Sequence, residues 1–204
     1  MKSIKLLSVY SILLICFTKK LHTMKKLLYT LAVIACFWFA ACKKHHGPQP
    51  DNPYGLPNAT QEGKNTLGCL LNGVPWTPKG FNGTANLSID VDKGVNNGIF
   101  GISAYRILSN DNRQYFGLSV SDSLNFISMP KTYQLGNNSL FGVYFSNNSC
   151  TFDYFNNAIV RNGILTLTKL DKTNRIISGI FNATLSKSGC ETIIITEGRF
   201  DMKY

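Results

Sequence analysis

The stretch GILTLTKLDKTNRIISGIFNATL, residues 163–185, decides the fold class of this chain. Along much of it, every second position is apolar or glycine, and Thr, Ser and Asn stand between. Because successive side chains of a β-strand point to opposite faces, this period places one set inward and the other outward. The inward set is Leu165, Leu167, Ile177, Gly179, Phe181, Ala183 and Leu185.

The same alternation recurs in two earlier runs, and turn signals separate the runs. The inward residues there are Leu87, Ile89 and Val91, and then Phe116, Leu118 and Val120. Asn and Gly, which tolerate the positive φ of tight turns, gather at 72–73, 82–83, 96–98, 136–138, 147–148, 156–157 and 162–163. Turn signals about 10 to 15 residues apart predict an all-β fold, an antiparallel meander or β-sandwich of about nine or ten strands with little helix.

The composition and length fit one globular domain. Of the 204 residues, 44% are apolar and 16% are charged, which is typical of a folded protein. The β-rich pattern fills residues 64–204, and about 140 residues are enough for one two-layer core. We therefore expect a single β domain over 64–204.

The formal charge of +10 suggests an acidic partner, but its distribution does not. Residues 1–41 hold six lysines and no acidic residue, and from Cys42 onward 15 basic residues stand against 11 acidic ones. Lys43 and Lys44 supply half of the remaining excess. A nearly neutral domain without a basic helix argues against nucleic acid as a partner.

From Met24 the sequence MKKLLYTLAVIACFWFAAC runs from basic residues through an apolar segment to small residues before Cys42. This order is that of a secretory signal, and it resembles a bacterial lipoprotein signal whose cysteine carries the lipid, palmitate included. We expect residues 24–41 to be the signal peptide and 1–23 to precede the true start. The alternatives are cleavage before Cys36, which would leave FWFAA exposed, a transmembrane anchor, or a core helix.

Residues 42–63 hold four of the seven prolines and no apolar period, which is typical of an extended tether. His45 and His46 within it lack further ligands and predict no metal site. Lys43 follows the lipidated cysteine, and resemblance to lipoprotein sorting signals then implies the outer membrane. No acidic run follows, which favours the periplasmic face over the cell surface.

Three stretches carry a resemblance to a family. They are NTLGCLLNGVPWTPKG at 65–80, the stretch 163–185, and GCETIIITEGRFDMKY at 189–204 with its GRFD motif. They resemble the framework of small, uncharacterised envelope lipoproteins of Bacteroidetes-type bacteria, classed as a domain of unknown function. The resemblance implies an envelope lipoprotein with a β-rich domain and assigns no chemistry.

The domain contains no histidine, because His22, His45 and His46 all precede it. Mechanisms that rely on a histidine base, and the common zinc sites, are therefore excluded within it. Paired-carboxylate chemistry remains open, although no spacing singles out a pair. The run IDVDKGVNNG starts like a calcium loop at Asp90 and Asp92 but lacks the required Gly and Glu, which favours a strand ending in a polar turn.

Two groups of residues are candidates for ligand contact. Glu197, Arg199 and Asp201 in TEGRFDMKY form either a polar binding cluster or a surface charge ladder beside a bulge at Gly198. Trp76 could form a sugar-stacking surface, although aromatic residues in a β domain are more often core. Its tyrosine partners would be Tyr105, Tyr115, Tyr133, Tyr144 and Tyr154.

Three thiols of the domain could pair in an oxidising envelope, and we expect the disulfide between Cys150 and Cys190, with Cys69 a buried free thiol. Ser123 in the tripeptide DSL matches an O-glycosylation pattern of such bacteria.

The sequence as a whole predicts a lipid-anchored envelope protein with a non-enzymatic binding or structural β domain, without cofactor or metal. Its partners would be the membrane through the lipid anchor and a glycan or envelope protein. The alternatives are a carbohydrate-binding module, which requires Trp76 and tyrosines on one exposed face, and a carboxylate-based glycan hydrolase, which requires two acids in a cleft within about 10 Å of each other.

Overall fold

The computed structural model describes residues 54–136, 139–154, 156 and 158–204. These belong to one compact unit, Pro48–Tyr204. The predicted leader 1–41, the lipidation residue Cys42, the alternative Cys36 and the tether as far as residue 53 lie outside the described residues.

The fold is all-β, as the sequence predicts. One short 3₁₀ turn, η1 (Val95–Asn97), accompanies the strands. The described residues form eleven strands rather than nine or ten, because β2 and β8 are only three and two residues long. The strands are β1 (Thr66–Leu71), β2 (Val74–Trp76), β3 (Leu87–Asp92), β4 (Ile99–Ser109), β5 (Asn112–Val120), β6 (Lys131–Leu135), β7 (Phe141–Ser146), β8 (Thr151–Phe152), β9 (Val160–Asp171), β10 (Ile176–Ser186) and β11 (Ile193–Lys203).

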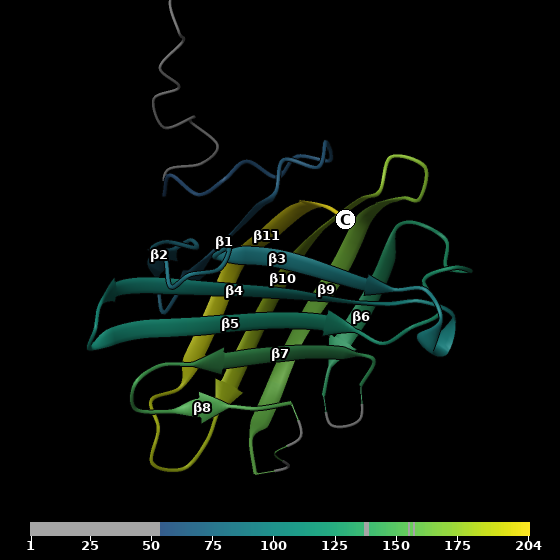
Figure 1. The fold of residues 1–204 in the computed structure, drawn as a ribbon. Coiled ribbons are helices and arrows are strands. Elements are labelled where there is room, and N and C mark those ends of the chain that lie inside the picture. The colour runs from purple at the N-terminus through teal and green to yellow at the C-terminus, as the bar shows by residue number, and fades with distance from the viewer. Residues whose placement is uncertain (1–53, 137–138, 155, 157) are drawn as a thin grey trace, which may run out of the picture. The chain divides into compact units, whose positions relative to one another are not determined.

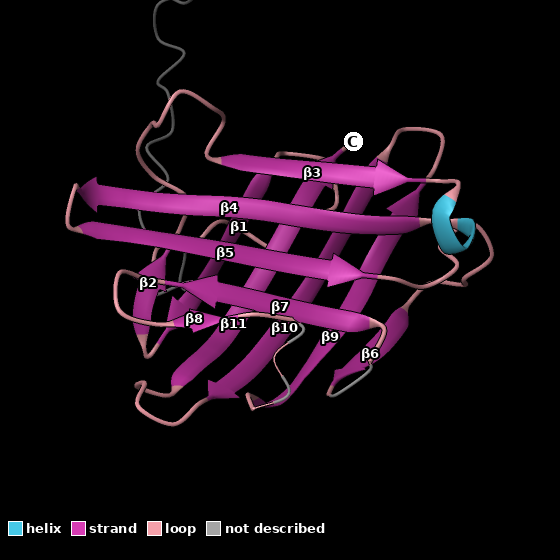
Figure 2. Ribbon diagram, turned by 60° about the horizontal axis from the view of Figure 1, so that its bottom comes forward, coloured by secondary structure: helices cyan, strands magenta, loops and turns pink. Residues whose placement is uncertain are grey.

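The strands form one open sheet that folds over into two layers. The strand order is β2-β1-β11-β10-β9-β6-β7-β5-β4-β3, with β8 beside β7. Figures 1 and 2 show β1, β11, β10, β9 and β6 as one layer, crossed at an angle by β3, β4, β5 and β7 as the other. The layers join where β6 meets β7 through one parallel pair, Leu135 and Phe141, and all other strand pairs are antiparallel. The sheet is therefore sandwich-like, with β2 and β3 at its edges.

The hydrophobic core lies between the two layers and follows the predicted alternation. Leu118, Leu165 and Ile177 are fully buried, and the rest of the predicted inward set from β5, β9 and β10 is buried with them. The β3 residues Leu87, Ile89 and Val91 are half-buried and pack against this core. The core cluster comes from residues 67–202, so this part of the chain contains a complete core of its own.

Turn prediction succeeded at one Asn-Gly pair and failed at another. Asn72 and Gly73 have φ of 49° and 80° and join β1 to β2, as expected. Asn162 and Gly163 instead lie inside β9, so the turn predicted there is wrong. A side chain at Gly163 would collide with the Asn182 carbonyl oxygen, and the glycine serves close strand packing rather than a turn.

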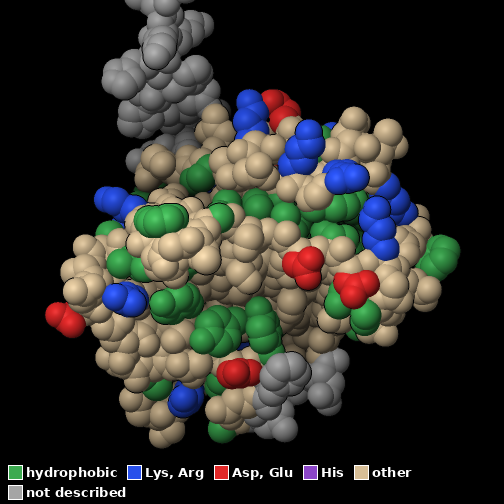
Figure 3. Space-filling model, in the orientation of Figure 1, with side chains coloured by type: hydrophobic (Ala, Val, Ile, Leu, Met, Phe, Trp, Pro, Cys, Tyr) green, Lys and Arg blue, Asp and Glu red, His purple; other side chains and the backbone are tan. Residues whose placement is uncertain are grey.

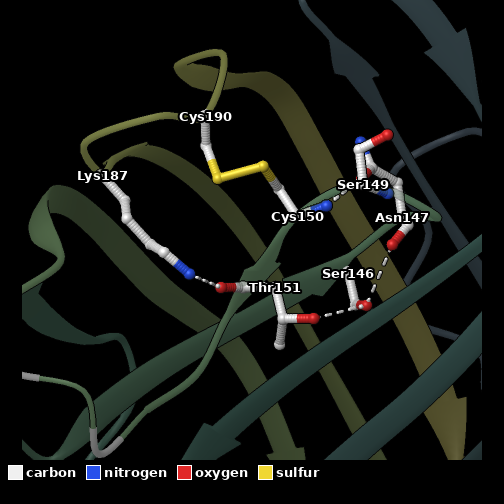
Figure 4. Close-up of a disulfide and its surroundings, with 7 residues drawn as sticks. All are labelled: Ser146, Asn147, Ser149, Cys150, Thr151, Lys187 and Cys190. Carbon is white, nitrogen blue, oxygen red and sulfur yellow. Dashed lines mark hydrogen bonds between the residues drawn. A yellow bond between two sulfur atoms is a disulfide. The ribbon is translucent and has the colours of Figure 1, made fainter.

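A disulfide ties the two layers together at one end. It joins Cys150, between β7 and β8, to Cys190, between β10 and β11, with the Cα atoms 6.0 Å apart (Figure 4). Beside it, Lys187 Nζ donates a hydrogen bond to the Thr151 carbonyl oxygen. The predicted pairing is confirmed, and Cys69 is a buried free thiol, as expected.

Candidate binding surfaces

The folded unit begins before residue 64, the boundary that composition predicted. Residues 56–64, which we call the strap, lie on the outer face of the layer that contains β11. Leu56 is buried, and Pro57 packs closely on Gly68 of β1. A Cβ added at Gly68 would lie 2.6 Å from Cδ of the Pro57 ring. The last part of the expected tether is thus packed on the sheet.

Asp201 holds the strap and is not a ligand-contact residue. Its side chain is fully buried, because the strap covers the outer face of β11 at this point. The carboxylate accepts five hydrogen bonds, of 2.6–3.1 Å, from the hydroxyls of Thr60 and Ser178 and from the backbone N–H groups of Glu62, Gly63 and Lys64. Both readings of Asp201 from the sequence, a binding cluster or a surface ladder, are therefore wrong.

The pKa of Asp201 reflects the same contacts. Burial disfavours the ionised carboxyl, but the hydrogen bonds from Thr60, Ser178 and the strap backbone outweigh it and lower the pKa to about 2. The group is therefore a buried anion at neutral pH. Hydrogen-bond donors stabilise its negative charge, in the way that a backbone nest binds an anion.

Glu197 and Arg199 lie on the same outer face, beyond the strap. The register of β11 against β10 shifts between Phe181 and Ala183, and Glu197 has a φ of 53°, which confirms the expected bulge. A Cβ at Gly198 would lie 2.5 Å from the Phe181 carbonyl oxygen. Arg199 donates to the Glu197 carboxylate at 2.9 Å, so these two members of the predicted cluster do pair with each other.

The pair borders a groove across β9, β10 and β11. The groove measures about 630 Å³, and its lining includes Ala59 of the strap as well as Glu197 and Arg199. Its floor is unusual for an outer face, because Ile164, Ile180 and Ile194, one on each strand, are 38%, 48% and 48% exposed. Hereafter this surface is the strap groove.

Trp76 does not belong to any exposed surface. Only 1% of it is exposed, its Nε1 donates to Gln114 Oε1 at 2.8 Å, and its ring packs against Phe116. Tyr105 and Tyr133 are also buried. The predicted sugar platform around Trp76 is therefore wrong, because the indole fills the core between the layers.

Tyr115, Tyr144 and Tyr154 belong to the opposite outer face, that of β5 and β7. Arg161 on β9 fixes the loop that carries Tyr154: its guanidinium donates to the backbone carbonyls of Asp153, Tyr154 and Asn156. No sequence signal pointed to Arg161, since a single arginine in a strand carries no pattern. Its role depends on which carbonyls the fold brings within reach.

The remaining candidates have ordinary structural surroundings. Asp92 Oδ1 accepts from the backbone N–H groups of Gly94 and Val95, so the calcium-like run is a strand that ends in a polar turn. Among the described residues, no three His, Cys, Asp or Glu side chains come together as a metal site. Ser123 is half-buried in the loop between β5 and β6, where its N–H donates to the Asp122 carboxylate.

A carboxylate-based glycan hydrolase needs two acids in one cleft. Four grooves on the described part of the chain, the strap groove among them, are each lined by at most one carboxylate. In the same part of the chain, no helix has the length and apolarity that crossing a bilayer requires. Comparison of the chain with protein-family models, curated proteins and solved structures found no match.

Proposed function

We propose that this chain is a lipid-anchored protein of the bacterial envelope whose β domain binds a partner without catalysis. The lipid is carried by Cys42, the tether sets the domain beside the outer membrane on its periplasmic side, and the family is that of the uncharacterised lipoproteins named above. The observation that carries the proposal is the strap groove, a surface with apolar residues and a charged border but no paired acids.

The partner that fits this groove best is an apolar segment of another envelope protein. Exposed aliphatic side chains grouped on one face of a domain mark contact sites for apolar surfaces, including those of other proteins. Ile164, Ile180 and Ile194 supply the apolar floor. Glu197 and Arg199, with side chains 58% and 14% exposed, can select the polar groups at the border of the partner.

Site-specific photo-crosslinking in the native envelope tests the proposal. A crosslinking amino acid at Thr184, in the groove, should give one discrete adduct with an envelope protein, and the same amino acid at Ser88, on the opposite layer, should not. The adduct should disappear in an Ile180→Asp variant, and the purified partner should bind that variant at least about tenfold more weakly. Equal adducts from both positions, or none from Thr184, would refute the proposal.

The lipid anchor has a separate test. Metabolic labelling with a fatty-acid analogue should mark the chain and should fail in a Cys42→Ser variant. Labelling that persists in Cys42→Ser and is lost in Cys36→Ser would move the anchor to the alternative cysteine.

A further inference from the structure

The outer face of β3, β4, β5 and β7, on the side of the molecule away from the strap groove, combines tyrosines, acidic residues and an open floor. The strand register brings Asp90, Gly101, Ser119 and Gly142 into one row across these strands. The next row consists of Ser88, Ser103, Gly117 and Tyr144. A Cβ at Gly101 would meet nothing within 4 Å, so the backbone of β4 is open at this point of the face.

Tyrosines form one side of this surface. Tyr154 lies across two glycines: a Cβ at Gly142 would be 2.6 Å from its Cδ1, and one at Gly117 would be 2.6 Å from its hydroxyl. Its ring also packs against Tyr144, with centroids 5.9 Å apart. Tyr115, 37% exposed, extends the aromatic side along β5.

Tyr154 is held firmly in this position. Arg161 fixes its backbone carbonyl, and its hydroxyl bonds to the side chain of Ser119. Burial of the ring edge raises the pKa of the phenol to about 12, so the hydroxyl stays neutral at any physiological pH. An aromatic side chain that is already fixed binds a ligand with little further loss of entropy.

Carboxylates form the other side. Asp90 and Asp92 are exposed on β3, two residues apart and on the same face. Figure 3 shows acidic side chains over β3 and hydrophobic ones over β5 and β7, with uncharged polar side chains or backbone between them. Asp90 and Asp92 thus place negative charge at the β3 side of this face, and Arg113, two residues before Tyr115 on the same face of β5, lies at the far side.

We propose that this face binds a neutral glycan chain. A pyranose ring offers C–H groups on its face and hydroxyls around its edge, and these match an aromatic side facing a row of carboxylate and hydroxyl groups. Tyr144, Tyr154 and Tyr115 pack against the sugar rings, and Asp90 with Ser103 accepts hydrogen bonds from their hydroxyls. The glycines let the chain approach the sheet, and the aspartates exclude uronic acid and sulfated sugars.

Amide chemical shifts of the mature chain, residues 42–204 with Cys42→Ser so that no lipid is attached, test this site. The probes are linear hexasaccharides of glucose, xylose, mannose and N-acetylglucosamine, with a galacturonic acid oligomer as the anionic counterpart. At least one neutral probe should shift the amides of Gly101, Ser103 and Gly117 at millimolar concentration or below. The anionic oligomer should bind at least about tenfold more weakly.

Two substitutions bring the test to single side chains. Tyr144→Ala and Asp90→Asn should each weaken binding of the neutral probe by about tenfold, since each removes one ring contact or one charged acceptor. Ile194→Ala, in the strap groove, should leave it unchanged. The proposal fails if no neutral probe shifts these amides, if the shifts fall on Ile180 and Ile194 instead, or if both substitutions leave affinity intact. Because the strap groove is not involved, failure here leaves the proposed protein partner standing, and the converse also holds.

Discussion

Each outer face of this protein is partly covered by a segment, and one charged side chain holds each cover in place. The two side chains have opposite charge. Asp201 collects N–H and O–H donors and holds the strap, whereas Arg161 collects three carbonyl oxygens and holds the loop of Tyr154. Thr60 and Asp201 are 141 residues apart, but Arg161 and Tyr154 only seven. One cover therefore depends on the completed fold, and the other is nearly local.

The difference teaches what each cover responds to. A carboxylate can be neutralised by acid, whereas a guanidinium keeps its charge throughout the pH range of proteins. The contacts that hold the strap should thus weaken in acid, whereas the contacts of Arg161 with the loop of Tyr154 should not. The following substitutions and conditions separate the two.

Removal of the Asp201 carboxylate should have the largest effect. Asp201→Ala leaves five donors of the strap and β10 without their acceptor, which should lower the free energy of unfolding by about 4 kcal/mol. Urea unfolding followed by the fluorescence of Trp76, the single tryptophan after residue 42, measures it. The exposed Asp90→Ala serves as control and should cost less than about 0.5 kcal/mol. A loss below about 1 kcal/mol in Asp201→Ala would show that the strap is held by other contacts.

Loss of the Arg161 guanidinium should come next. Arg161→Met frees three carbonyls that are partly accessible to water, so we expect a loss of about 2 kcal/mol in the free energy of unfolding. The amide signals around Tyr154 should broaden or shift while those of the strap stay in place. Arg113→Met, which removes one exposed bond to Asn110, should change neither. Disturbance of the strap signals by Arg161→Met would mean that the two covers are coupled.

Acid should weaken one cover only. The pKa of Asp201 is about 2 in the folded chain, below the ordinary value of about 3.9 for an unfolded one. A lowered pKa stabilises the fold above the unfolded value and is lost as pH falls toward the folded one. We expect a loss of about 2 kcal/mol between about pH 5 and pH 2, absent in Asp201→Asn.

A matched variant checks this assignment. Bonds from the backbone and side chain of Asn174 also lower the pKa of Asp171, but that carboxyl is only half-buried, whereas Asp201 is fully buried. Asp171→Asn should therefore keep most of the acid-dependent loss. If instead it removes the loss and Asp201→Asn does not, the pH dependence belongs to the β9–β10 turn.

The smallest effect contrasts two glycines on the outer face of β3, β4, β5 and β7. Gly142→Ala pushes a methyl group against the fixed Tyr154 ring and should cost about 1.5 kcal/mol. Gly101→Ala meets open space and should cost little. Thermal unfolding of the two variants measures the difference. Equal losses of stability in the two variants would indicate that the Tyr154 ring moves aside freely. The ring would then not be a rigid contact surface for a ligand.

The sequence predicts best what depends on neighbours along the chain. Alternation identified the inward residues of β3, β5, β9 and β10, since burial of a strand face repeats every two residues. The disulfide was predicted from local sequence too, because Cys150 and Cys190 stand in loop-like positions while Cys69 lies in an apolar run. By contrast, Asn162–Gly163 has the composition of a turn and becomes part of a strand because β10 passes close to it.

The binding surfaces were predicted only in part, and the reason is distance along the chain. Nothing in TEGRFDMKY reveals that residues 60–64 will cover Asp201, and nothing near Trp76 reveals that Phe116 will pack on it. Glu197 and Arg199 were correctly placed together because they lie two residues apart on one strand. A strand pattern therefore tells which face a residue occupies, but not which segment lies upon that face.

The strand order of the open sheet ends at β2 and β3, and the chemistry of these two strands bears on how copies of the chain meet. Anchoring by a lipid would concentrate copies in two dimensions, where unpaired strand edges favour aggregation by strand addition. The edge strand β2 is only three residues long and contains Pro75, which lacks an N–H donor. At the other edge, Asp90 and Asp92 place like charges on β3. Both ends of this strand order thus carry features that oppose strand addition by a second copy.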